Sequence, residues 1–284
     1  MEKRVLYFDC FSGISGDMTI GALLDLGIDR EEFLSRMKKI KLDEFELEIK
    51  PGIKKGITGT DFTVHIQKPG VEEPEHHHAA HEHHHHHAHG DHHHHGHEHH
   101  HAHAEAHAHG PSRNLNDIYQ IIDNSELSDY VKVTSKRIFE IVAVAEAKIH
   151  GKAIDEVHFH EIGAVDSIVD IIGAAICLEM LHVDEVISSP LNLGSGFVHC
   201  EHGVFPVPAP ATLEILKEVP VYSKNAQKEL TTPTGAAIIK AVCSEFRPLP
   251  EFTIGKIGYG LGKRDMETPN VLRVIIGKKK SPAH

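Results

Sequence analysis

The chain has 284 residues, of which 40% are hydrophobic, and a formal net charge of −12 with histidine counted as neutral. This length allows one sizeable core or two modest ones. Because the chain is acidic and has no basic stripe or aromatic stacking motif, we expect no nucleic acid among its partners. Histidine is the outlier in the composition: most of the 29 histidines lie between His76 and His109.

Targeting and redox signals are weak in this sequence. The N-terminal residues lack the apolar core of a signal peptide, and no apolar run approaches the ~18 residues that a membrane span needs. The four cysteines are far apart and form no C-x-x-C pair, so neither a zinc ribbon nor a disulfide framework is predicted. We therefore expect a cytoplasmic protein with no membrane contact.

The N-terminal part is predicted to begin with a strand, a loop and a helix. Residues 5–8 are a short apolar run typical of a buried strand, and a Gly/Ser loop follows at 12–16. Apolar residues at helical spacing then predict one helix directly after the loop and another over 31–40. The alternating segments 45–49 and 61–66, which are joined through glycines, predict a β-hairpin.

A histidine-rich insertion interrupts this pattern. Over residues 71–110 the composition changes to histidine with alanine, glycine, aspartate and glutamate. Such a segment has too little apolar surface to offset its ordering entropy, so we expect a disordered insertion. We predict that residues 1–70 and 111–284 form a single mixed α/β (α+β) domain around it.

Order is expected to resume at Asn114, and Asn116 is a candidate cap for a helix through Ile122. Residues 155–163 are predicted to be a short strand or an extended turn. Further helices are predicted over 131–150, 164–181, 209–216 and 234–246, and strands over 183–188, 252–257 and 271–276.

The histidine tract predicts metal binding. Imidazole suits nickel, copper, zinc and cobalt, and nickel and copper stand near the top of the affinity order. A flexible tract has no fixed geometry, so it would store or deliver a metal, nickel first among them. A neutral low-complexity linker is the alternative, whereas a purification tag is disfavoured because the tract is internal and irregular. The predicted ligands are His83, His84, His85, His86, His87, His92, His93, His94 and His95.

The Gly/Ser loop between the first strand and helix is a candidate anion site. Its glycines let backbone N–H groups converge on a phosphate beside a helix N-terminus, and Asp9 could hold a cation there. The loop lacks the Gly-Lys-Ser/Thr of a P-loop, so ATP hydrolysis is not implied. A tight turn with a charge at the helix start is the equal alternative. The candidate residues are Asp9, Ser12, Gly13, Ser15, Gly16 and Asp17.

A second candidate site lies ahead of the apolar helix over 164–181. In an extended chain His158 and His160 point to one face, with Glu161 and Asp166 nearby. Asp166 and Asp170 are one helical turn apart, and carboxylates in an otherwise apolar helix are costly to bury unless paired or metal-bound. This density of ligands predicts a catalytic metal site. The alternative is that the imidazoles are structural and the aspartates cap the helix.

Two further motifs are compatible with phosphate binding. Thr232, Thr234 and Gly235 open a helix, where hydroxyl groups and amides favour an anion, although simple capping explains the threonines equally well. Lys263 and Arg264 follow a glycine-rich stretch and form a basic loop that could close on a phosphate, a weak signal by itself.

Taken together, these motifs resemble a known family. The stretches YFDCFSGISGDM, AEAKIHG, VHFHEIGAVDSIVDIIGAA, HGVFPVPAPAT, ELTTPTGAA and GYGLGKRDMETPNVLRV look like those of the nickel-insertion proteins of the lactate racemase cofactor pathway (LarC). The resemblance implies insertion of nickel, as Ni(II), into pyridinium-3,5-bisthiocarboxylic acid mononucleotide, which forms one carbon–nickel and two sulfur–nickel bonds. It also implies a CTP requirement with Mg or Mn. The expected activity is that of a chelatase or cyclometallase of the lyase class.

The resemblance also bears on how much of the protein is present. Family members continue past the PNVLRV strand into a C-terminal region where CTP is thought to bind, so we expect this chain to be the N-terminal part. Its activity is expected to need that region or a partner, and a homo-oligomer is a further expectation. A non-catalytic nickel store or chaperone is the main alternative function. A metal-dependent phosphohydrolase, supported by Asp9 and Asp17 alone, is the third.

Overall fold

The structure is a computed structural model, and it describes residues 2–42, 45–66, 113–159, 164–200, 203–224 and 226–280. Residues Met1–Gln67 and His109–His284 belong to one compact unit. The predicted insertion over 71–110 lies outside the described residues, as do His160 and Glu161 and the side chain of His158. Of the helices that are described, none is long and apolar enough to span a membrane.

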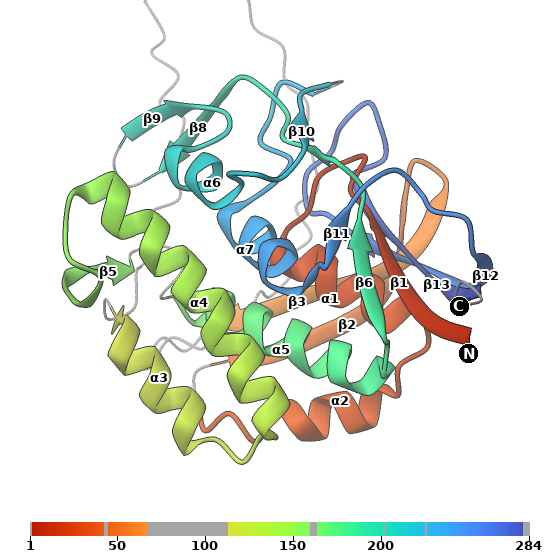
Figure 1. Cartoon of the computed structure of the whole chain (residues 1–284), viewed down its shortest axis with the longest axis horizontal. Coiled ribbons are helices and arrows are strands. Elements are labelled where there is room, and N and C mark those ends of the chain that lie inside the picture. The colour runs from red at the N-terminus through yellow and green to blue at the C-terminus, as the bar shows by residue number, and fades with distance from the viewer. Residues whose placement is uncertain are drawn as a thin grey trace, which may run out of the picture. The chain divides into compact units, whose positions relative to one another are not determined.

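A mixed sheet forms the framework of this unit (Figure 1). Strand β1 (Glu2–Asp9) lies between β6 and β13, parallel to the former and antiparallel to the latter. The described strands of the sheet follow the order β11 (Glu245–Phe246), β6 (Glu185–Ser188), β1, β13 (Val271–Lys280), β12 (Thr253–Leu261), β3 (Ile57–Ile66) and β2 (Phe45–Lys54). The predicted mixed α/β class is therefore confirmed.

Helices pack against one face of the sheet and against each other (Figure 1). Helix α1 (Gly16–Asp25) contacts β12 and β3, and α5 (Val165–Leu181) packs on α1. Most of α5 is buried, in agreement with its apolar sequence. The remaining helices are α2 (Arg30–Met37), α3 (Leu115–Asn124), α4 (Asp129–His150), α6 (Pro210–Ile215) and α7 (Pro233–Val242).

Glycines let α1 approach the sheet closely. A Cβ added to Gly260 of β12 would overlap the carbonyl oxygen of Met18, and one added to Gly258 would overlap that of Ala22. Conversely, a Cβ on Gly21 of α1 would come within 2.6 Å of the Thr60 carbonyl oxygen. The N-terminus of α1 is thereby held at a fixed depth over β12 and β3.

Asp25 ties the C-terminal end of α1 to the same two strands. Its carboxylate accepts the Tyr259 backbone N–H at 2.9 Å and the Thr60 hydroxyl, also at 2.9 Å. We expect Asp25→Ala to lower the free energy of unfolding by about 2 kcal/mol, because the backbone donor would lose a charged partner. Urea denaturation checks this expectation, with Asp25→Asn as the conservative comparison. An unchanged midpoint for Asp25→Ala would contradict it.

Most predicted elements are present, with two corrections. The helix at 115–124 is capped by Asn114 and not Asn116: Asn114 Oδ1 accepts the Asp117 N–H, and the Asp117 carboxylate accepts the Asn114 N–H. The helix predicted to reach residue 246 ends at Val242, because the N–H of Ser244 donates to Val186 and β11 joins β6. The short strand or extended turn predicted over 155–163 is present in its described part, where a 3₁₀ turn (Ile154–Glu156) precedes β5 (His158–Phe159).

Short ladders were not predicted. Their bounds are β4 (Arg113–Asn114), which pairs with β5, β7 (Leu191–Asn192), which pairs with β10 (Val221–Tyr222), and β8 (Phe197–Cys200), which pairs with β9 (Gly203–Pro206).

Candidate functional site

The N-termini of three helices converge on one cavity. The cavity has a volume of about 390 Å³, and residues of β3 also line it. Its walls come from the starts of α1, α5 and α7, from β3, and from the loop between β12 and β13. The lining residues are Ser15, Gly16, Asp17, Phe62, Thr63, Val64, Asp166, Ser167, Asp170, Glu229, Thr232, Pro233, Thr234 and Lys263.

The cavity gathers residues from three motifs that are far apart in the sequence. Among the lining residues, those predicted from the sequence are Ser15, Gly16, Asp17, Asp166, Asp170, Thr232 and Thr234. The strand residues Phe62, Thr63 and Val64 were missed, since alternation predicts a strand but not what the strand faces. Lys263 was noted only as part of a basic loop, and Glu229 only as the first residue of the ELTTPTGAA motif.

Two of the predicted glycines serve chain packing. Gly13 has a φ of +78°, and a Cβ at this position would overlap the backbone of Leu230. A Cβ on Gly235 would overlap the Ile14 carbonyl group, which accepts the N–H of Thr232 at 3.0 Å. The amides of Gly13 and Ile14 donate to the carbonyl groups of Cys10 and Leu230. The Gly/Ser loop and the start of α7 are thus held together from both sides.

Asp170 of α5 caps the neighbouring helix α1. Ser15 occupies the N-cap position of α1 without making a side-chain capping bond. The backbone N–H of Asp17 instead donates to the Asp170 carboxyl group, and a Cβ on Gly16 would overlap that group. The Oδ1 atom of Asp170 is inaccessible to solvent and has no hydrogen-bond partner among the described residues, although the residue as a whole keeps some exposure.

Burial and charge crowding disturb the two aspartates at this cap. Desolvation, followed by the charges of Asp17 and Asp166, holds the pKa of Asp170 well above its usual range. Desolvation also raises the pKa of Asp17, while a hydrogen bond from Ser15 opposes this rise. The nearby Lys263 lowers the pKa of both carboxyl groups. The cavity therefore carries an excess of acidic groups that a bound cation would relieve.

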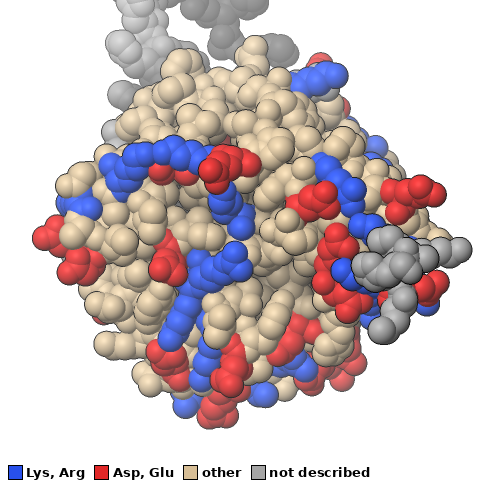
Figure 2. Space-filling model, viewed as in Figure 1, with Lys and Arg blue, Asp and Glu red and all other residues tan. Residues whose placement is uncertain are grey.

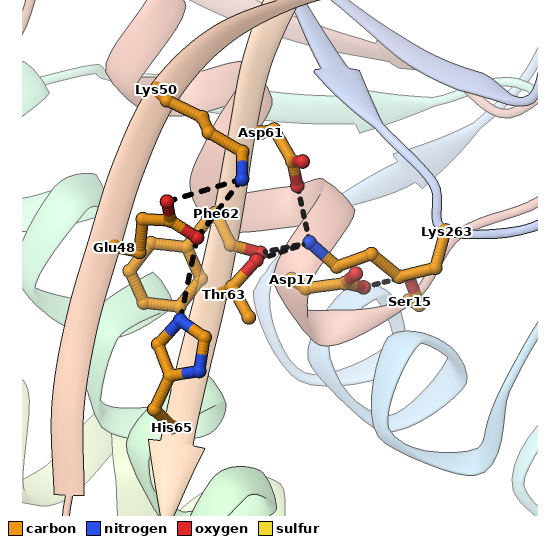
Figure 3. Close-up of polar contacts among 9 residues, drawn as sticks. All are labelled: Ser15, Asp17, Glu48, Lys50, Asp61, Phe62, Thr63, His65 and Lys263. Carbon is orange, nitrogen blue, oxygen red and sulfur yellow. Dashed lines mark hydrogen bonds and ion pairs between the residues drawn. The ribbon is translucent and has the colours of Figure 1, made fainter. Parts of the chain in front are cut away.

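Lys263 fixes the outer wall of the cavity (Figure 3). Its ammonium group donates to the Phe62 carbonyl oxygen at 2.9 Å, to the Thr63 hydroxyl and to the Asp61 carboxylate. Three acceptors on β3 thus use the three donors of this lysine. Figure 3 also shows a separate exposed group on the β2–β3 hairpin, in which Glu48 accepts from Lys50 and contacts His65.

The predicted residues at the end of β1 lie outside the cavity lining. Asp9 is ion-paired with Arg273, whose Nε donates to the carboxylate at 2.9 Å, and the guanidinium lies over the ring of Phe11. Ser12 is buried, and its hydroxyl has no partner within the described ranges. A role for either residue in cofactor binding stays a prediction.

The predicted inner metal site is only partly covered. Asp166 and Asp170 both line the cavity, but His160, Glu161, the side chain of His158 and the tract histidines lie outside the described residues. Where side chains are described, no group of three or more histidine, cysteine, aspartate or glutamate residues is placed to hold a metal ion. The complete ligand set therefore stays a prediction.

Comparison with known proteins decides the family. The profile of the family described as "Nickel insertion protein" matches residues 6–284, nearly the whole chain. This chain belongs to the nickel insertion protein family. The resemblance that the sequence motifs indicated is thereby confirmed.

Curated relatives within this family are similar over almost the full chain. The "Pyridinium-3,5-bisthiocarboxylic acid mononucleotide nickel insertion protein" of Clostridium kluyveri is 48% identical over 277 residues, covering 97% of this chain and 62% of the relative. The protein of the same name from Clostridium acetobutylicum is 52% identical over 279 residues, covering 98% and 65%. A "Putative nickel insertion protein" of Maridesulfovibrio salexigens is 55% identical over 272 residues, covering 95% and 62%.

The family relatives are longer than this chain, which spans less than two thirds of each of these three. No solved structure matches the chain.

A second hollow, of about 830 Å³, lies between α4 and the α6–α7 region. Apolar and charged residues both line it, among them Ile141, Val144, Arg137, Lys240 and Glu140. Figure 2 shows lysine, arginine and acidic side chains interspersed over the face on which these helices lie. Of the predicted functional residues whose side chains the structure describes, none lines this hollow.

Proposed function

We propose that this chain takes part in the insertion of nickel into pyridinium-3,5-bisthiocarboxylic acid mononucleotide, forming the nickel-pincer nucleotide of lactate racemase. The observation that carries the proposal is the 48% and 52% identity, over 97% and 98% of the chain, to two proteins that bear this activity in their names. Nickel is a substrate in this reaction. The reaction class is that of a chelatase or cyclometallase, a lyase.

The chemistry sets three requirements. One ring carbon–hydrogen bond breaks, one carbon–nickel and two sulfur–nickel bonds form, and the released proton goes to a base within hydrogen-bond reach. We propose that His158, His160, Glu161 and Asp166, together with Asp170, receive the metal. The acidic excess around Asp17 and Asp170 supports a site that attracts a divalent cation. In this proposal the starts of α1 and α7 hold the nucleotide through Ser15, Gly16, Thr232, Thr234 and Gly235.

The histidine tract is proposed to deliver nickel to this site. Its composition supports binding of nickel and of other borderline cations. The last residues of β3 before the tract include Val64, a lining residue of the cavity. On the far side of the tract, β4 pairs with β5, which precedes Glu161 and Asp166 in the chain. The described segments on both sides of the tract therefore lead to residues of the proposed acceptor site.

CTP with Mg or Mn is proposed to act elsewhere in the longer relatives. The cavity carries four carboxylate residues and one lysine that is already bonded to β3, a poor match for a triphosphate. We propose that CTP binds in the part of those relatives that this chain does not span. A cytoplasmic location and assembly into a homo-oligomer belong to the same proposal.

A metallation assay tests the proposal. Nickel, the pyridinium mononucleotide and CTP–Mg are mixed with this chain and the remaining region of a relative, and the metallated product is measured by mass spectrometry. We expect His160→Ala to abolish product, because it removes a ligand of the inner site. Deletion of residues 75–110 is expected to preserve turnover at saturating nickel and to lower it only when nickel is scarce.

Two results would contradict this expectation. Full activity of His160→Ala would remove the proposed inner site. Nickel uptake by the tract without any product, in the presence of the complementing region, would favour the nickel store instead.

A further inference from the structure

The loop between β12 and β13 joins opposite walls of the cavity through two adjacent basic residues. Lys263 bonds to β3, as described above, whereas Arg264 donates to the carbonyl oxygen of Glu229 and lies 3.7 Å from its carboxylate. Glu229 lines the cavity and precedes α7. The next residue, Asp265, points outward with a side chain that is 95% exposed. The loop thus continues from the cavity wall onto the outer surface.

Lysines from two other segments act on Asp265. Lys54 reaches it from the β2–β3 hairpin with an Nζ–Oδ1 distance of 3.0 Å. The hydrogen bond and charge of Lys54, and then the charges of Lys55 and Lys228, lower the pKa of the Asp265 carboxyl group. We call Lys54, Lys55 and Lys228 the basic rim.

The backbones that carry the basic rim are held in place. Lys55 and Gly56 form the two-residue turn of the hairpin, with φ values of 48° and 85°. The backbone at Lys228 is packed tightly against Gly194. A Cβ on Gly194 would overlap the Lys228 carbonyl oxygen, and Gly194 forms a β-bridge with Glu229. Lys55 follows Lys54, the partner of Asp265, and Lys228 precedes Glu229, the partner of Arg264, so both lysines lie beside the β12–β13 loop.

The basic rim has cationic capacity that the protein does not use. Lys263 is paired with Asp61, Arg264 with Glu229, and Lys54 with Asp265. Within the described parts of the chain, Lys55 and Lys228 have no ion pair or side-chain hydrogen bond, and both are exposed. The basic rim thus has three ammonium groups and one paired carboxylate, Asp265, and the three oxygens of a phosphate are suitable acceptors for such groups.

We infer that the basic rim binds the phosphate group of the mononucleotide, while the ring end of the nucleotide enters the acidic cavity. The identity of the ligand rests on the proposed function. The cavity repels a phosphate through Asp17, Asp166 and Asp170, so the two ends of the substrate are sorted by charge. In this arrangement the phosphate is bound at the tip of the β2–β3 hairpin beside the β12–β13 loop, in addition to any contact that it makes with a helix N-terminus.

Calorimetry with the full chain tests the inference. Affinity is measured for pyridinium-3,5-bisthiocarboxylic acid mononucleotide and for its dephosphorylated nucleoside, with Lys55→Met/Lys228→Met as the variant. Lys38→Met/Lys152→Met, which removes the same charge from exposed sites outside the cavity and the rim, is the matched control. We expect the first pair to weaken mononucleotide binding at least about tenfold, to leave nucleoside binding unchanged, and to reduce the salt dependence of binding.

A second variant gives a result of opposite sign. Asp265→Asn removes the carboxylate that competes with the phosphate, so we expect it to tighten mononucleotide binding severalfold without affecting the nucleoside. Equal mononucleotide affinity in the rim variant and the control pair would overturn the inference but leave the proposed function standing. Failure of the unmodified chain to bind the mononucleotide, together with absence of product in the metallation assay, would remove both.

Discussion

Asp170→Asn is expected to stabilise the protein at neutral pH and to reduce nickel insertion sharply. The folded state raises the pKa of Asp170 mainly by desolvation, so the folded protein binds a proton more tightly than the unfolded chain does. Between the unfolded value of about 3.9 and the raised folded value, the unfolding free energy of the unmodified protein therefore falls as pH rises. Asparagine has no carboxyl group to titrate, so it removes this pH-dependent fall in the unfolding free energy, and its side-chain oxygen can still accept the Asp17 N–H.

Thermal unfolding of metal-free protein at a series of pH values measures the effect. The melting temperature of Asp170→Asn should exceed that of the unmodified protein by an amount that grows from acidic to neutral pH. Asp155→Asn, on an exposed 3₁₀ turn, is the control and should show no such trend. If the melting temperature of Asp170→Asn instead fell below that of the unmodified protein as the pH rose to neutral, the buried carboxylate would be stabilising.

The loss of activity in Asp170→Asn follows from the same burial. A neutral amide removes negative charge from the cavity, and with it part of the attraction for a divalent cation. We expect product formation to fall at least about tenfold, with the larger effect at low nickel concentration. A protein that gains stability as it loses function is the signature of a strained functional site. Unchanged turnover at all nickel concentrations would assign Asp170 to helix capping alone.

Gly260→Ala is expected to be the most destabilising single methyl addition in the sheet. Its Cβ would overlap the Met18 carbonyl oxygen and come within 2.6 Å of the Ala22 amide, both in the backbone of α1. Helix α1 cannot simply move away, since Gly258 meets the same helix one turn further along. We expect a loss of about 3 kcal/mol in the free energy of unfolding.

Urea denaturation measures this loss, with Gly255→Ala as the matched change in the same strand. A Cβ at Gly255 would have its nearest contact at 3.2 Å, with the Ile276 carbonyl oxygen, so its cost should be smaller. Equal midpoints for the two variants would mean that α1 shifts over the sheet at little cost.

Local patterns in the sequence predicted much of the fold. The hairpin of β2 and β3 and helix α4 were expected from the spacing of their apolar residues, and β1 and α5 were expected from their apolar runs. Helix ends were less certain: the capping choice between Asn114 and Asn116 depends on side-chain bonds, and the end of α7 depends on pairing with β6. Strands of two to four residues are too short to show a recognisable alternation of apolar and polar side chains.

The candidate site was predicted in pieces and not as a whole. Three motifs were identified separately, but their meeting point depends on the glycine contacts between the Gly/Ser loop and the start of α7. The hydrogen bond by which Asp170 caps α1 joins two helices that are distant in sequence, so no local sequence pattern could predict it. Lys263 was noted as basic, but its three bonds to β3 depend on the tertiary structure.

The pairing of β1 with β13 has a consequence for biosynthesis. Glu2 lies opposite Lys280 and Asp9 opposite Arg273, so strand β1 needs as its neighbour a strand that is synthesised much later. Until synthesis passes Lys280, the hydrogen-bonding edge of β1 that faces β13 has no native partner, and such an edge invites pairing with other chains. Closure between ends so distant in sequence is also slow. Nascent chains of this protein are therefore expected to depend on holding chaperones until translation has gone beyond this point.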